Sequence, residues 1–325
     1  MKRKMNQTSL LSFFAALCLL VGVSDTEAGA QNQEQRVTRT LEIGPEGELS
    51  VSNIFGNIHV EATTGEQVTI EAVKRLHGDA EPALLDRVEI DINHTGRRVR
   101  IETRHQGGRG GGHHREHDSH GGVSVDYRVS APVGTEIEIQ TVSGDVTVRG
   151  VDGEARVGSV QGTVDVSDLR ALASAKSVSG DVTVKRARSD DDVEISSVSG
   201  EVFVDDIAAE ELTISSVSGD VRLVQASCEE GEFSTVSGDV RYTGRITKGG
   251  RYELKTHSGD IVMTIDDDVG FELEASTFSG DIESDFPMRL ETEGRHRRNL
   301  EAVFGDGSAN IEATTFSGDI ELRKH

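Results

Sequence analysis

The chain has 325 residues, and its 57 acidic and 34 basic side chains give a formal net charge of −23 at neutral pH. A surface this acidic repels nucleic acids and anionic membranes, and we therefore expect no nucleic acid partner. Aromatic residues make up 4% of the chain and tryptophan is absent, which argues against a sugar-binding groove built on an exposed aromatic platform.

Residues 1–30 have the layout of a secretory signal peptide. Lys2, Arg3 and Lys4 form a positive start, residues 10–23 are an apolar run, and Ala28-Gly29-Ala30 is a small-residue cleavage site. The run is shorter than the ~20 residues that span a bilayer. We therefore expect export to the periplasm, the cell surface or the medium, with no membrane span after cleavage. The exported chain would keep one cysteine, Cys228, and so no internal disulfide.

Residues 31–104 are predicted to form an irregular β-rich section. The stretches "TLEIGPEGELSVSNIFGNIHVEA" and "QVTIEAVKRL" alternate apolar and polar residues, as half-buried strands do. Residues 79–88, "DAEPALLDRV", predict one short helix with Pro82 in its first turn. The stretches "VEIDI" and "RRVRIETR" predict a hairpin around "NHTG".

Residues 105–122, "HQGGRGGGHHREHDSHGG", contain no apolar side chain and predict a flexible loop. Imidazole nitrogens with nearby carboxylates suit Zn²⁺, Ni²⁺ or Cu²⁺. The loop is thus either a divalent-metal site or a solvated low-complexity segment. The candidate metal ligands are His105, His113, His114, His117 and His120.

Residues 123–325 repeat one short motif, seen as "TVSGDV" at 141–146, "SVSGDV" at 216–221 and "TFSGDI" at 315–320. Apolar residues alternate on both sides of each motif, which predicts two short strands around a turn, recurring about every 19 residues. Such a unit can bury its apolar face only against its neighbours, which favours an all-β fold, a β-solenoid. A sandwich does not explain the constant spacing, and a propeller blade needs about 40 residues. The central glycines are Gly144, Gly162, Gly180, Gly200, Gly219, Gly238, Gly259, Gly280 and Gly318, with an outlying copy at Gly56.

The gap between Gly280 and Gly318 is interpreted as two coils with an inserted turn, and the coil at 311–323 is expected at the end of the stack, where something must cap it. Each glycine is expected to take a positive φ at a corner. The Ser or Thr three residues earlier would form a hydroxyl stack. The carboxylates after the glycines would form a ladder of turn residues or, alternatively, bind Ca²⁺. These are Asp145, Asp181, Glu201, Asp220, Asp239, Asp260, Asp281 and Asp319.

The leader, the alternating section, "YRVSAPVGTEIEIQTVSGDVTVRG" and the serial S-G-D-[VI] coils together resemble the bacterial exported β-solenoid domains known as putative adhesins, a family of unknown function. The resemblance covers residues 38–325. It implies the solenoid fold and export, and it supplies no catalytic residues.

Enzyme motifs are missing: the chain has no G-x-S-x-G, P-loop or Cys-x-x-Cys. His257, Ser258 and Asp260 share one turn and cannot converge as a catalytic relay. We therefore expect a non-enzymatic exported β-solenoid that acts as an envelope scaffold or an adhesin-like binding module, with no cofactor and an unknown envelope or extracellular partner. The alternatives are an extracytoplasmic metal-binding protein that uses the histidine loop and a carbohydrate-active β-helix enzyme.

Overall fold

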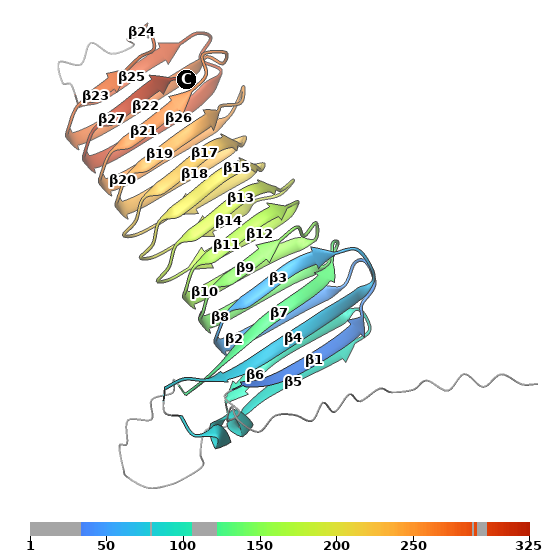
Figure 1. The fold of residues 1–325 in the computed structure, drawn as a ribbon. Coiled ribbons are helices and arrows are strands. Elements are labelled where there is room, and N and C mark those ends of the chain that lie inside the picture. The colour runs from blue at the N-terminus through green and yellow to red at the C-terminus, as the bar shows by residue number, and fades with distance from the viewer. Residues whose placement is uncertain (1–33, 79, 106–121, 288, 291–297) are drawn as a thin grey trace, which may run out of the picture. The chain divides into compact units, whose positions relative to one another are not determined.

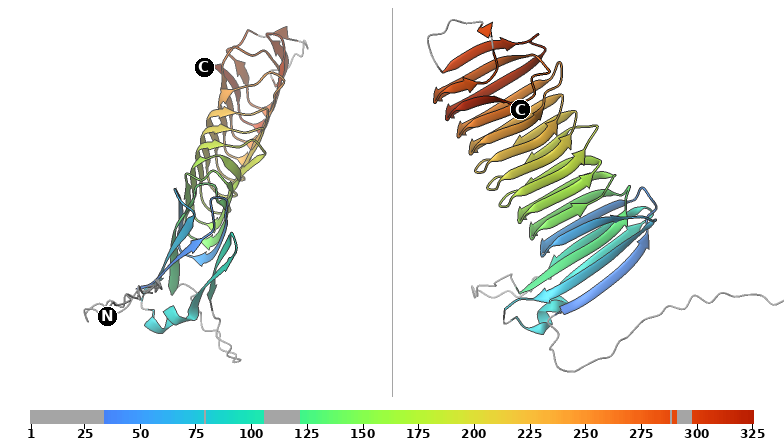
Figure 2. Two further views of the ribbon diagram at one scale, coloured as in Figure 1. Left: turned by 90° about the vertical axis from the view of Figure 1, so that its right-hand side faces the viewer. Right: turned by 45° about the horizontal axis from the view of Figure 1, so that its top comes forward.

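The structure is a computed structural model that describes residues 34–325, except 79, 106–121, 288 and 291–297. These residues form an all-β stack of two long sheets, as predicted (Figure 1). The turned views in Figure 2 show the two sheets as thin layers that face each other.

Sheet A has 13 strands, in the spatial order β1 (Glu34–Glu42), β4 (Gln67–Leu76), β7 (Val123–Pro132), β3 (Ile58–Thr63), β9 (Val146–Arg149), β11 (Val164–Leu169), β13 (Val182–Arg188), β15 (Val202–Ala208), β17 (Val221–Ser227), β19 (Val240–Arg245), β21 (Ile261–Ile265), β27 (Ile320–Lys324) and β23 (Ile282–Ser284). Sheet B has 14 strands, in the order β24 (Arg289–Leu290), β25 (Asn299–Phe304), β22 (Phe271–Ser279), β26 (Ala309–Ser317), β20 (Arg251–Ser258), β18 (Glu230–Ser237), β16 (Glu211–Ser215), β14 (Val193–Ser196), β12 (Ala171–Ser177), β10 (Glu154–Gln161), β8 (Glu136–Ser143), β2 (Glu48–Phe55), β6 (Arg98–His105) and β5 (Val88–Thr95).

Each coil of the solenoid contributes one strand to each sheet. Strand β16 of sheet B leads through a turn into β17 of sheet A, and both pair in parallel with the same strands of the next coil, β18 and β19. Equivalent residues therefore lie side by side, as Val221 does with Val240. Parallel strands are about 4.8 Å apart, so any feature of one coil becomes a column along the stack.

The core fills the narrow space between the sheets. Inward residues such as Val221, Leu223 and Ile214 are fully buried, and the outward residues between them are mostly polar. The thiol of Cys228 is buried in the core, and this burial raises its pKa to about 12. A thiol held protonated in this way is unreactive at neutral pH.

The N-terminal section shares both sheets with the repeats. The coil made by β2 and β3 lies between the β6–β7 coil and the β8–β9 coil. The predicted hairpin is confirmed, because β5 and β6 pair antiparallel. The predicted short helix is the 3₁₀ helix η1 (Pro82–Arg87), whose Leu85 is buried; Asp79 lies outside the described residues. Antiparallel strands β1 and β4 close sheet A at this end.

The C-terminal coils do not follow chain order, so two expectations were wrong. The last coil, β26–β27, lies between the β20–β21 coil and the β22–β23 coil. It is thus inside the stack and both its edges are paired. The described residues of the gap before it form no second coil either, because β25 pairs antiparallel with β22 and β24 pairs antiparallel with β25, so that the two strands form a cap. Phe286 and Phe304 of this cap region pack on Phe271 and cover the core.

No helix in the described part of the chain is long and apolar enough to cross a membrane.

Candidate functional site

The S-G-D motifs line one long edge of the stack, where each sheet B strand ends and the next sheet A strand begins. We call this corner the SGD edge. In the β6–β7 coil, the residues between the two strands, 106–121, lie outside the described residues. Elsewhere the turn repeats from coil to coil.

The glycines of the SGD edge stack directly on one another. A Cβ added to Gly219 would lie 2.6 Å from the carbonyl carbon of Gly200 and closer still to its oxygen. The same clash recurs at every stacked motif glycine. Gly144 has a φ of 149°, but the backbone at Gly219 and Gly238 lies outside the left-handed region. The expected positive φ is therefore wrong for these coils: the close approach of the neighbouring backbone is what demands glycine.

From Ser159 to the C-terminal end of the stack, hydroxyl groups three residues before each glycine join successive coils. Ser216 Oγ donates a hydrogen bond to the carbonyl oxygen of Gly200 at 3.0 Å, and Thr235 Oγ1 donates to Gly219 at 2.9 Å. These side chains are buried, so the bonds satisfy carbonyls that water cannot reach. The expected hydroxyl stack is confirmed, with its bonds running between coils.

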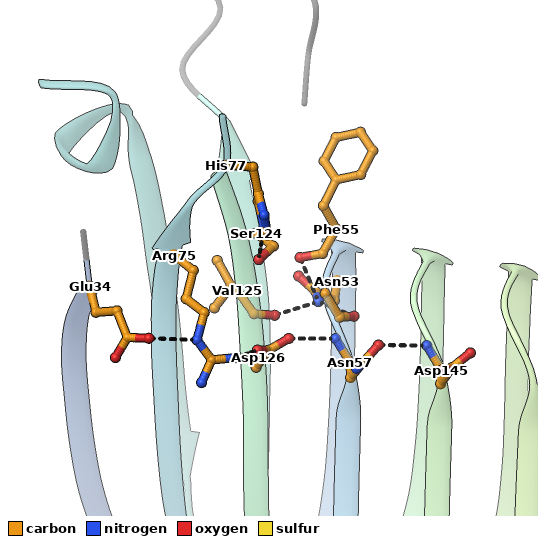
Figure 3. Close-up of polar contacts among 11 residues, drawn as sticks. Glu34, Asn53, Phe55, Asn57, Arg75, His77, Ser124, Val125, Asp126 and Asp145 are labelled. Atoms are coloured by element: carbon orange, nitrogen blue, oxygen red, sulfur yellow. Dashed lines mark hydrogen bonds and ion pairs between the residues drawn. The ribbon is translucent and has the colours of Figure 1, made fainter. Parts of the chain in front are cut away.

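The carboxylates after the glycines also act between coils. Asp220 Oδ1 accepts a hydrogen bond from the backbone amide of Asp239 at 2.9 Å, and Asp239 Oδ1 accepts from Asp260 at 2.9 Å. Asn57 takes the same place near the N-terminal end, where its Oδ1 accepts from Asp145 (Figure 3). Six of the eight carboxylates accept such a backbone hydrogen bond, which explains how the fold tolerates carboxylates ~4.8 Å apart; they are Asp145, Asp181, Asp220, Asp239, Asp260 and Asp319.

We predict that Asp220→Asn changes the free energy of unfolding by less than about 0.5 kcal/mol, because an amide oxygen makes the same bond at Asn57. Asp220→Ala should cost about 1 kcal/mol, because the Asp239 amide loses its acceptor. Thermal melting of the three proteins with calcium and with a chelator is the measurement. A calcium-dependent rise in melting temperature that Asp220→Asn reduces would overturn this structural role and establish a cation ladder.

An exposed apolar column runs along the SGD edge, two residues before each glycine. Its valines are 43–47% exposed, and Phe316 and Phe278 are 48% and 61% exposed. Single exposed apolar residues are common on proteins, but a row of them on adjacent coils, interrupted once by His257, forms a contiguous patch of the kind that marks an interaction surface. We call this row the apolar stripe; in spatial order it comprises Ile54, Val142, Val160, Val178, Val198, Val217, Val236, His257, Phe316 and Phe278.

The C-terminal end of the apolar stripe is aromatic. The ring of His257 stacks on Phe316 at a centroid distance of 4.9 Å, and Phe316 stacks on Phe278 at 4.8 Å. The guanidinium of Arg298 lies 5.9 Å from the centre of the Phe278 ring. Because the faces of these rings pack against one another, only the ring edges at this end are available to a partner. A sugar would need an exposed flat ring face.

The two flanks of the apolar stripe differ in charge. The column two residues before the stripe, on the outer face of sheet B, is neutral or cationic; it comprises Ser52, Gln140, Gly158, Lys176, Ser196, Ser215, Ser234, Lys255, Thr314 and Ser276. We call it the hydroxyl column. On the other flank, beyond a position that is a serine in most coils, lies the acidic column, which is made of Asn57, Thr163 and the eight carboxylates named above.

A groove of about 480 Å³ lies beside the N-terminal end of the acidic column. Its Arg75 is paired with Glu34 and Asp126, as Figure 3 shows, and its Arg36 with Glu71. Internal pairing of these charges leaves little attraction for an anion, so the groove is a weaker candidate than the apolar stripe.

The predicted metal ligands fall mostly outside the structure. His105 ends β6 and its ring meets that of Phe55 edge-on at 5.8 Å. His113, His114, His117 and His120 lie outside the described residues, so the metal site stays a prediction. Among the residues that are described, no group of three or more His, Cys, Asp or Glu side chains could hold a metal ion.

Solved structures similar to the chain include a putative adhesin from Bacteroides fragilis (11% identity, 90% of this chain and 97% of that chain covered, TM-score 0.41). They also include a putative adhesin from Parabacteroides distasonis (12%, 89% and 97%, TM-score 0.38) and a putative lipid binding protein from the same organism (12%, 89% and 96%, TM-score 0.35). Likenesses this distant carry no argument about function.

No curated protein is significantly similar to the chain. Residues 47–323, which include nearly all of the described strands, match the Toastrack DUF4097 family. The chain therefore belongs to the Toastrack DUF4097 family, whose members share this β-solenoid architecture and have no assigned function.

Proposed function

We propose that the protein is an exported, non-enzymatic module of the cell envelope, in which the solenoid is a scaffold and the SGD edge is its binding surface. The leader at residues 1–30 supports export. The observation that carries the binding role is the apolar stripe, which stays exposed over every coil from β8–β9 to the C-terminal cap.

The chemistry of the edge favours another polypeptide as the occupant. The cores of protein interfaces are apolar and enriched in aromatic and arginine side chains, as at Phe278, Phe316 and Arg298. The stacked rings leave no free face for a sugar, which disfavours the carbohydrate-active alternative.

Site-specific photo-crosslinking in cells tests this proposal. A photoreactive residue replaces Val217 of the apolar stripe or, as a matched control, Val224, a partly buried outward valine of the same coil on sheet A. Illumination should give a crosslinked product from position 217 and none from position 224. The mature protein should begin at Gln31 when it is recovered from outside the cytoplasm.

Absence of a product at position 217, or equal products at both positions, would contradict the binding role of the edge. A full-length chain with its leader retained in the cytoplasm would contradict export.

A further inference from the structure

We infer that the occupant of the SGD edge is a second copy of this chain, aligned parallel and in register, so that the two apolar stripes pack against each other. This inference rests on the proposed role of the edge. It is carried by the repeat distance of the edge and by the charge difference between its two flanks.

The repeat distance selects the partner's architecture. Apolar positions recur every ~4.8 Å along the stripe. Side chains on one face of a helix recur about every 5.4 Å, and those on one face of an extended strand about every 6.7 Å. A helix would therefore be out of step by half a repeat after about four coils. Another parallel β-stack keeps its register over the whole stripe, and this chain is itself such a stack.

The charge pattern selects the orientation. A twofold axis parallel to the stack lays stripe against stripe and places the acidic column of each copy opposite the hydroxyl column of the other. The carboxylate of Asp220 then faces donors such as Ser215 or Ser234, and the hydroxyl column contains no carboxylate that would repel it. A twofold axis across the stack would instead place carboxylate against carboxylate. Twofold symmetry of this isologous kind is the commonest in soluble oligomers.

The length of the stripe suits a specific contact. Ten stripe positions at ~4.8 Å extend over roughly 45 Å, so the ~800 Å² per copy of a standard stable interface requires a contact about 18 Å wide, in which the two flanking columns take part with the stripe. The large net negative charge of each chain opposes the contact over a distance, so association should strengthen as salt screens that repulsion.

Sedimentation of the purified mature protein, residues 31–325, tests self-association. We expect a dimer that forms more tightly at higher salt. Val217→Thr with Val236→Thr, which removes apolar contact on both copies, should weaken dimerisation at least about tenfold. Val224→Thr with Val262→Thr makes the same chemical change on the outer face of sheet A and should leave it unchanged. The melting temperature of each variant shows whether the monomer still folds.

Single cysteines test the orientation. Val142→Cys and Val236→Cys stand far apart along the stripe, and the native Cys228 is buried. In the parallel, in-register dimer each introduced cysteine faces the same cysteine of the partner chain. Both variants should therefore form disulfide-linked dimers on oxidation. An antiparallel pair could link at most one position near its centre.

A protein that sediments as a monomer at every concentration and salt level, or a dimer that the stripe variants do not weaken, would overturn this inference. Failure of either cysteine to cross-link would overturn the parallel register. If position 217 nevertheless crosslinks to a different protein in cells, the proposed function stands and only the identity of the occupant is wrong.

Discussion

Replacing Gly219 with alanine should destabilise the protein by about 3 kcal/mol or more, measured as the free energy of unfolding in denaturant. The new Cβ would overlap the backbone carbonyl of Gly200 in the adjacent coil. Backbone on both sides is held by parallel pairing, so relief requires two coils to separate and breaks hydrogen bonds on both sheets. The effect does not depend on a positive φ, because Gly219 does not have one.

Gly158→Ala is the matched control, because this glycine lies in the same solenoid on strand β10. The nearest atoms to a Cβ placed there, the carbonyl oxygens of Ile139 and Lys176, are 3.9 Å away, an ordinary contact. This change should be neutral or slightly stabilising, since alanine restricts the unfolded chain. If both changes destabilised the protein equally, the loss of free energy of unfolding would come from the loss of glycine flexibility and not from a clash between coils.

Replacing Val221 with aspartate should cost about 4 kcal/mol and lower the melting temperature sharply. Its side chain is fully buried at the start of β17, between Val202 and Val240 of the neighbouring coils. A carboxylate there has no hydrogen-bonding partner and must be buried either charged or protonated. The cost should be larger at neutral pH than at acid pH, where the protonated form predominates.

Val224→Asp tests whether inward position is the cause. Val224 lies on the same strand and points away from the core, so its replacement should cost less than about 1 kcal/mol. A Val221→Asp protein that melts like the wild type would show that the inward face of β17 is assigned wrongly.

The periodicity of the sequence was enough to predict the solenoid, because an inward residue such as Leu223 recurs at a fixed place in each coil. The importance of the motif glycine was also predictable, but its cause was not. The sequence shows that glycine is required at this position. Whether it is required because of a positive φ or because of a neighbouring backbone depends on how the coils stack.

The order of the C-terminal coils could not be read from the chain. The β26–β27 and β22–β23 coils carry the same motif and would pair equally well in either order. The antiparallel strand β25 determines the order of the coils, because it pairs with one edge of β22. Strand β26 then pairs with the other edge of β22 and lies between β22 and β20. Such a choice depends on contacts between distant segments, which local patterns do not encode.

The apolar stripe could have been found from parity alone. In "SVSGDV" at 216–221, Ser216 and Val221 have the inward parity of their strands, so Val217 must point outward. An apolar residue that recurs at an outward position is a signal distinct from the core pattern. The inward apolar positions on both sides of the turn indicate the core, and the outward valines are a second pattern beside it.

The claim that the SGD edge is a binding surface is tested most directly by asking whether the apolar stripe is covered in cells. Cysteines placed at Val217 and at Val224 can be labelled with a membrane-impermeant thiol reagent, in cells and after purification at high dilution. The buried Cys228 should not react in either state. We predict that the cysteine at 224 labels fully in both states, whereas the cysteine at 217 is protected in cells and becomes reactive in the dilute protein. Equal labelling of both positions in cells would contradict the claim that the SGD edge is a binding surface.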